Sequence, residues 1–165
     1  MRQRLLVPLA LIYVLTLQAA CGASTLSKLH DTLNKTTKSL NAAAKTNHSF
    51  YEGGVYGAVG SAEAIAVRAK AATVIHDANE KLILALNLAQ QLTAATFEQG
   101  KIAVLGALAD AAAGLHTGNV KIDLVLQAVA TLINQAVVII EAFKSADLRI
   151  VLPEIRGWRL EAVNA

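Results

Sequence analysis

The chain has 165 residues, of which 55 % are apolar and only 4 % aromatic, a composition that suits close-packed helices. The formal charge is +3, but without Arg2 and Arg4 only 13 basic side chains stand against 12 acidic ones. A nearly neutral domain lacks the clustered basic surface of nucleic-acid-binding proteins, so the composition argues against a nucleic-acid partner.

The first 21 residues have the three-part pattern of a secretory signal. Arg2 and Arg4 precede an apolar run of 13 residues, from 5 to 17, and the small residues Ala19 and Ala20 then lead to Cys21. A membrane-spanning helix needs about 20 apolar residues. The pattern therefore predicts a signal peptide over residues 1–20 and not a membrane span.

The segment from Leu17 to Cys21 resembles the cleavage site of bacterial lipoproteins, with Gln18 at a position that is normally aliphatic. The resemblance implies cleavage before Cys21 and attachment of a diacylglycerol thioether and an N-acyl chain to that cysteine. Two or more acyl chains anchor a protein stably to a membrane. Because Cys21 is the only cysteine, its acylation would leave no thiol for a disulfide.

The residue after the cysteine bears on the destination. In such lipoproteins a residue other than aspartate generally permits export to the outer membrane, and Gly22 stands there. The resemblance thus implies the periplasmic face of the outer membrane in preference to the inner membrane. Two alternatives remain open: cleavage after Ala19 or Ala23, which would give a soluble periplasmic or secreted protein, and an uncleaved anchor.

The next segment, residues 21–52, is predicted to hold one helix and the start of a loop. The helix is expected to begin at Ser24 or Thr25 and to end near His48, with the loop running on to Gly60. Its apolar positions recur at helical spacings of 3, 4 and 7 residues. These positions are Leu26, Leu29, Leu33 and Leu40.

Residues 53–147 are predicted to form the body of the protein. Helical patterns cover Ser61–Phe97, Ile102–Leu115 and Val120–Ala146, with a helix stop expected at Gly100 and a break at residues 116–119, where Gly118 stands. The last pattern is the most apolar, and its polar residues fall on one narrow stripe. That stripe comprises Asp123, Gln127, Thr131 and Asn134.

An internal repeat relates residues 60–97 to residues 100–137 at an offset of 40. It predicts either a duplicated helical hairpin, with a turn near 77–79 in the first copy, or one unbroken helix from 61 to 97 that faces two shorter helices. Both versions are an all-α antiparallel bundle of four to five helices.

Three histidines, His30, His76 and His116, each follow an aliphatic residue at related positions. We interpret them as residues at helix ends, where a positive charge suits the helix dipole. The alternative is a metal or tetrapyrrole site formed by their convergence. The sequence contains no HExxH, GxSxG, CxxC or Walker A motif, so we predict neither an enzyme nor a bound cofactor.

Residues 124–143 are apolar enough to suggest a transmembrane helix. Gln127, Asn134 and Glu141 argue against this, because such side chains are disfavoured at the centre of a bilayer. A buried bundle helix is the preferred interpretation, and a membrane-inserting or pore-forming helix is the alternative.

The C-terminal arm, residues 148–165, differs in character from the rest. Pro153 ends any regular structure, and the only tryptophan, Trp158, lies between Arg156 and Arg159. The arm either packs along the bundle or is an exposed segment that docks on a membrane or protein, for which Trp flanked by Arg is well suited.

The sequence as a whole predicts a lipid-anchored protein of the bacterial cell envelope. Its expected role is that of a non-catalytic structural or protein-interaction module whose partner is an unidentified protein or a second copy of the chain. One alternative is a membrane-active protein whose helices oligomerise or form a pore. Another is an enzyme or ligand carrier that uses the interior of the bundle.

Overall fold

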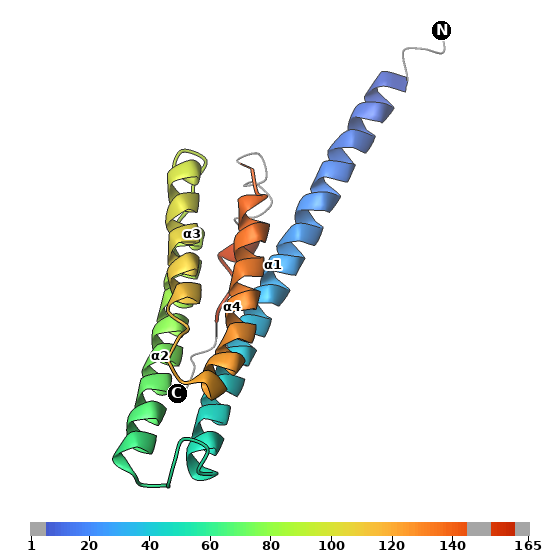
Figure 1. Ribbon diagram of the computed structural model, residues 1–165. Coiled ribbons are helices and arrows are strands. Elements are labelled where there is room, and N and C mark those ends of the chain that lie inside the picture. The colour runs from blue at the N-terminus through green and yellow to red at the C-terminus, as the bar shows by residue number, and fades with distance from the viewer. Residues whose placement is uncertain (1–5, 145–152, 161–165) are drawn as a thin grey trace.

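The computed structural model describes residues 6–144 and 153–160, excluding the side chains of residues 6–24. Four helices follow one another: α1 (Leu6–Glu52), α2 (Ala62–Gln90), α3 (Phe97–Ala113) and α4 (Val120–Glu141). They pack antiparallel, with α1 and α3 each contacting both α2 and α4 (Figure 1). The predicted all-α antiparallel bundle is confirmed.

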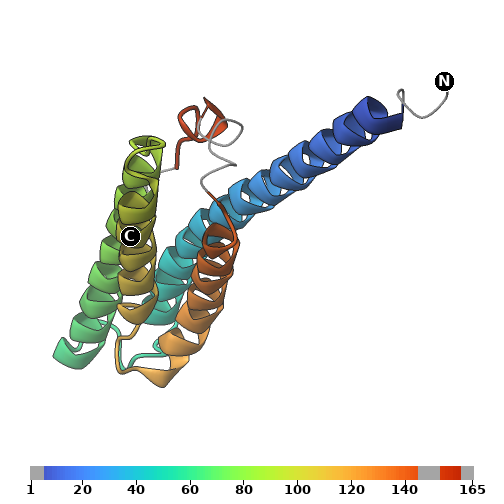
Figure 2. The same ribbon diagram turned by 90° about the horizontal axis from the view of Figure 1, so that it is seen from above.

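Helix α1 is longer than the sequence pattern suggested. The predicted start at Ser24 or Thr25 and the predicted end near His48 are both wrong, because the helix is continuous from Leu6 to Glu52. Its N-terminal part extends beyond the bundle, whereas its C-terminal part belongs to the core (Figures 1 and 2). The leucine seam packs as predicted, since Leu26, Leu29, Leu33 and Leu40 are all buried.

Helix α2 passes without a break through residues 77–79. Ser61 caps its N-terminus by accepting a hydrogen bond from the backbone N–H of Ala64 at 3.2 Å. The helix ends at Gln90, seven residues before the predicted end at Phe97. Residues 60–97 therefore contribute one helix and the start of the next, whereas residues 100–137 form the α3–α4 hairpin. The duplicated hairpin is wrong, and the unbroken helix facing two shorter ones is the arrangement observed.

The two glycines that were expected to end helices behave differently. Gly118 has a φ of +83°, a conformation that favours glycine, and it forms the predicted break between α3 and α4. Gly100 lies within the first turn of α3, so the predicted helix stop there is wrong. A Cβ atom at Gly100 would overlap Cδ2 of Leu92, so glycine at this position lets that side chain approach the α3 backbone closely.

Helix α4 packs through one face and exposes the other. Its inward side chains recur every three or four residues and are at most 1 % exposed: Ile122, Leu126, Val129, Ile133 and Ala136. Of the predicted polar stripe, Gln127, Thr131 and Asn134 face solvent, but Asp123 is buried. By length and composition α4 is the one helix in the described part of the chain that could cross a membrane, and about 28 % of its most apolar stretch is buried.

The two ends of the bundle have different components. At one end α1 leaves the bundle beside the α2–α3 connection and the end of α4 (Figure 1). The opposite end, which we call the distal tip, consists of the α1–α2 connection (53–61) and the α3–α4 connection (114–119). Lys121 ties these connections together, because its Nζ donates a hydrogen bond to the carbonyl oxygen of Val55 at 2.9 Å.

Candidate functional site

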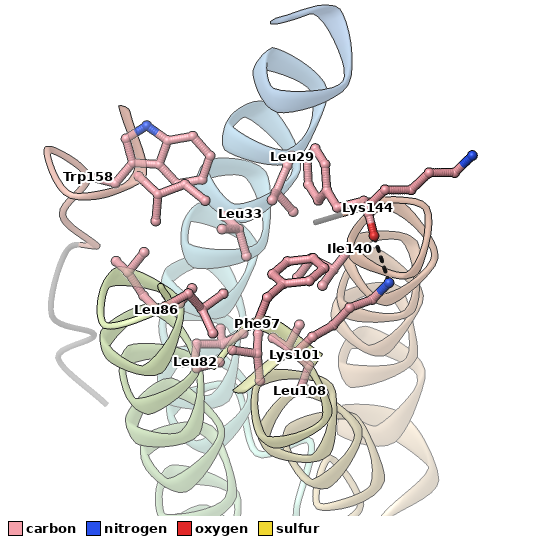
Figure 3. A pocket seen from close by; sticks show the side chains of 16 residues that line it. Leu29, Leu33, Leu82, Leu86, Phe97, Lys101, Leu108, Ile140, Lys144 and Trp158 are labelled. Atoms are coloured by element: carbon pink, nitrogen blue, oxygen red, sulfur yellow. Dashed lines mark hydrogen bonds between the residues drawn. The ribbon is translucent and has the colours of Figure 1, made fainter. Parts of the chain in front are cut away.

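An apolar pocket lies at the end of the bundle from which α1 emerges (Figure 3). It encloses about 50 Å³ and is lined by all four helices, by the residues that follow α4 and by residues 153–160. We call it the end pocket. Of the described residues that line it, 14 are apolar and two are lysines.

The end pocket results from the alternation of large and small side chains on one face of α2. Leu82 and Leu86 fill the space between the helices, whereas Ala85 and Ala89 on the same face leave it open. On the other side Phe97, in the first turn of α3, is 4 % exposed and closes the wall. Small residues opposite large ones in this way produce a cavity that tightly packed cores rarely retain.

The polar groups of the end pocket are Lys101 and Lys144. The Nζ of Lys101 donates hydrogen bonds to the carbonyl oxygens of Glu141 at 2.7 Å and Phe143 at 2.8 Å. These carbonyls belong to the C-terminal end of α4, where backbone acceptors lack helical partners. Lys101 thereby links α3 to α4, and its ammonium group lies 5.7 Å from the ring centroid of Phe97.

Residues 153–160 close one side of the pocket. Ile155 is 4 % exposed, and the indole of Trp158 stacks on the imidazole of His30 with 4.7 Å between the centroids. The Nε2 group of Gln90 donates to the carbonyl oxygens of Ile155 at 3.1 Å and Trp158 at 3.0 Å. For these residues the arm packs along the bundle, as the first of the two interpretations predicted.

The predicted docking residues divide into two groups. Trp158 is half-buried at the pocket, whereas Arg156 and Arg159 are exposed. The guanidinium of Arg159 donates to the carbonyl oxygens of Trp158 at 2.7 Å and Arg156 at 3.3 Å. The structure therefore brings the tryptophan, but neither arginine, into the lining of the site.

Comparison with protein-family models, with curated proteins and with solved structures found no match to this chain.

The three related histidines do not converge. His30 lies within α1, His76 lies within α2 at 3.9 Å from Glu80, and His116 follows α3. Within the described residues no group of three or more His, Cys, Asp or Glu side chains could hold a metal ion. The helix-end interpretation fits only His116, because the other two are in the middle of helices.

A polar cluster that sequence reasoning missed lies at the distal tip, around Asp123. Its Oδ1 accepts hydrogen bonds from the backbone N–H of Thr117 at 2.8 Å and from the hydroxyl of Thr117 at 2.6 Å. Its Oδ2 accepts from the N–H of Gly118 at 3.1 Å and lies 2.8 Å from Nδ1 of His116. The signal was present in the sequence, since an aspartate in the first turn of a helix after a Thr-Gly turn can bond back to that turn.

These contacts determine the ionisation of Asp123. Burial alone would raise the pKa of its carboxyl group, but the hydrogen bonds from Thr117 and Gly118 and the nearby His116 together outweigh burial and lower that pKa. The carboxylate is thus a structural acceptor that holds the α3–α4 turn.

Cys21 lies in the part of α1 whose side chains are outside the described residues, so its lipidation stays a prediction.

Proposed function

We propose that the chain is a lipid-anchored protein of the bacterial cell envelope, attached through Cys21 to the periplasmic face of the outer membrane, and that it is a non-catalytic structural or protein-interaction module. The supporting observation is the pattern of residues 1–21, with Ala19 and Ala20 before Cys21. Helix α1 runs on from that position into the core, so an anchor there would be coupled directly to the bundle. From Cys21 to Leu29, where the pocket lining begins, the helix rises only about 12 Å. An anchor at Cys21 would hold the end pocket next to the bilayer.

The surface of the bundle supports an interaction role. Leu124 and Val138 on α4 are 62 % and 64 % exposed, and Ile102 on α3 is 70 % exposed. Leu124 and Val138 are 14 residues apart, or two heptads, so they lie on the same face of the helix. Gln127, Thr131 and Asn134 lie between them on this face, so it offers both aliphatic and hydrogen-bonding side chains to a partner helix, including α4 of a second copy.

The experiment is mass spectrometry of the mature protein, together with membrane fractionation of a Cys21→Ser variant. We expect the mature chain to begin at Cys21 and to carry the mass of a diacylglycerol group and an N-acyl chain. We expect the serine variant to lack that mass and to leave the membrane fraction or to accumulate with its signal. A mature protein that still begins with Met1, or one without acyl mass, would contradict the proposal.

A second candidate function follows from α4 itself. Its length and apolar composition are those of a membrane-crossing helix, and most of its apolar stretch is not buried in the bundle. A membrane-active protein would release dye from phosphatidylcholine liposomes, and the double variant Leu124→Lys, Val138→Lys would lose that release. The absence of dye release by the wild-type chain would exclude this candidate and favour the module.

A further inference from the structure

We propose that the end pocket is a binding site for one aliphatic chain of an amphiphile whose head group is anionic, either a fatty carboxylate or an anionic phospholipid. This goes beyond the proposed function and does not depend on acylation of Cys21, because the described lining residues begin at Leu29.

The lining determines the apolar character of the ligand. A water molecule needs roughly 10–15 Å³ and several polar partners. The pocket has a volume of about 50 Å³, and its lining is apolar except for Lys101 and Lys144. A site with room for water and without partners for it favours an apolar occupant. The space is well below the roughly 150 Å³ of a cavity that holds benzene, so it admits only the end of an aliphatic chain unless the arm moves.

Lys101 determines the charge of the ligand. None of the described lining residues is acidic, and the stem of Lys144 lines the pocket while its ammonium group points away from it (Figure 3). An ammonium group has three donors, and two of those on Lys101 are directed to carbonyl oxygens of α4 and the residues after it. The third can be offered to a carboxylate or phosphate. Small-molecule sites commonly combine an apolar pocket with a few polar groups that fix orientation.

The arm determines how a chain longer than the present space could enter. The helices that form the other walls pack against one another along their lengths. The arm is held by the burial of Ile155, by two hydrogen bonds from Gln90 and by the stacking of Trp158 on His30, whereas each helix packs against two others. The entering chain displaces the indole of Trp158 from the rim. Because Trp158 is the only tryptophan in the chain, its fluorescence reports this event directly.

The test uses the full-length protein in phosphatidylcholine vesicles and follows Trp158 emission during titration with decanoate. We expect a saturable shift in emission. Decanol, which has the same chain but no charge, and decyltrimethylammonium, which is cationic, should bind about fivefold more weakly, the ratio that an exposed ion pair of about 1 kcal/mol provides. Vesicles that contain phosphatidylglycerol but no decanoate then show whether a bilayer lipid is the source of the chain.

Matched variants separate binding in the pocket from partition into the bilayer. Ala89→Leu places extra carbon atoms in the pocket, and we expect decanoate to bind about tenfold more weakly, as for overpacking of 1–3 kcal/mol. Ala128→Leu makes the same change on the exposed face of α4 and should bind as the wild type does. Val104→Ala enlarges the pocket and should favour dodecanoate over decanoate, with circular dichroism checking that each variant is folded.

The outcomes decide the proposal. An unsaturable emission change, or equal decanoate binding by wild type and Ala89→Leu, would overturn the pocket as a binding site. Equal binding of decanol and decanoate would overturn the assignment of an anionic head group. Loss of acylation at Cys21 would leave all of these results unchanged, so the anchor and the pocket are tested separately.

Discussion

Two buried asparagines differ in how their side chains are satisfied. The Nδ2 group of Asn47 donates to the carbonyl oxygen of Arg68 at 3.0 Å, and its Oδ1 accepts from the hydroxyl of Tyr56 at 3.0 Å. Asn79 is 3 % exposed, and its Oδ1 has no hydrogen-bond partner among the described residues. A buried acceptor without a partner loses its hydration without compensation.

We therefore expect Asn79→Leu to raise the free energy of unfolding by about 1 kcal/mol, because it removes an unsatisfied group and adds apolar contact. Asn47→Leu is the matched control and should lower that free energy by about 2 kcal/mol, since it leaves the buried Tyr56 hydroxyl without its partner and removes the bond between α1 and the Arg68 carbonyl. Thermal and urea unfolding would measure both. A destabilised Asn79→Leu variant would show that the amide is satisfied in solution.

Asp123 should make the stability of the α3–α4 turn depend on pH. Its pKa is lowered in the folded state, so its contribution is present above the unfolded pKa of about 3.9 and disappears as the pH falls through the folded pKa. Asp123→Asn replaces an acceptor with a donor that faces the N–H of Gly118. We expect a loss of about 1–2 kcal/mol at pH 7.

The pH dependence distinguishes this role of Asp123 from simple packing. Urea unfolding of wild type and Asp123→Asn between pH 2 and 8 should show a stability difference that is constant above about pH 5 and shrinks towards low pH. A difference that stays the same across the whole range would mean that the ionised carboxylate does not stabilise the turn.

At the scale of the elements, the periodic parts of the helices could be predicted and their ends could not. The leucine seam of α1 and the inward face of α4 follow from spacing alone, because the helical repeat places these residues on one side. Gly118 and Gly100 have the same sequence signal. Their surroundings distinguish them: Gly118 adopts a positive φ in a turn that Asp123 holds, whereas Gly100 stays helical beside Leu92.

This contrast leads to a paired prediction. Gly118→Ala should cost about 1–2 kcal/mol, because an L side chain is strained at a φ of +83°. Gly100→Ala should be close to neutral, because alanine gains about 1 kcal/mol of helix propensity while Cδ2 of Leu92, the end of a flexible side chain, moves aside. Chemical denaturation of the two variants would check this. Equal losses would indicate that Leu92 cannot move.

The predicted hairpin in the first repeat copy is not formed, for a related reason. The first copy has Ala78 where the second has Gly118, and without a residue suited to positive φ the helix continues through His76 and Asn79. The two copies therefore share residue types but not structure. The absence of glycine at position 78 predicted the course of the helix better than the shared histidine and asparagine did.

At the scale of the whole molecule, the sequence singled out the tryptophan of the candidate site but not the site. Trp158 is the only tryptophan in the chain, and it lies between Arg156 and Arg159. The end pocket combines residues from α1, the other three helices and the arm, which are as far apart as Leu29 and Trp158. No local pattern can reveal an assembly of segments so distant in sequence.

The attachment of the arm can be tested at one residue. Gln90→Ala removes both hydrogen bonds to the arm, so we expect about twofold stronger acrylamide quenching of Trp158 and a loss of global stability of no more than about 2 kcal/mol. The neighbouring exposed Gln91→Ala is the control and should leave quenching unchanged. Unchanged quenching in Gln90→Ala would show that the burial of Ile155 and the stacking of Trp158 on His30 hold the arm without these hydrogen bonds.

The unbroken course of α1 through the bundle has a consequence for reach. If Cys21 is the point of attachment, the 32 residues from there to Glu52 form a stiff stalk of about 48 Å. The distal tip, with its connection at 53–61 and the Asp123 turn, then lies at a fixed distance from the point of attachment. Lengthening or shortening the stalk by whole helical turns would change that distance in steps of about 5.4 Å. A partner that binds the tip must therefore lie within that distance of the anchor.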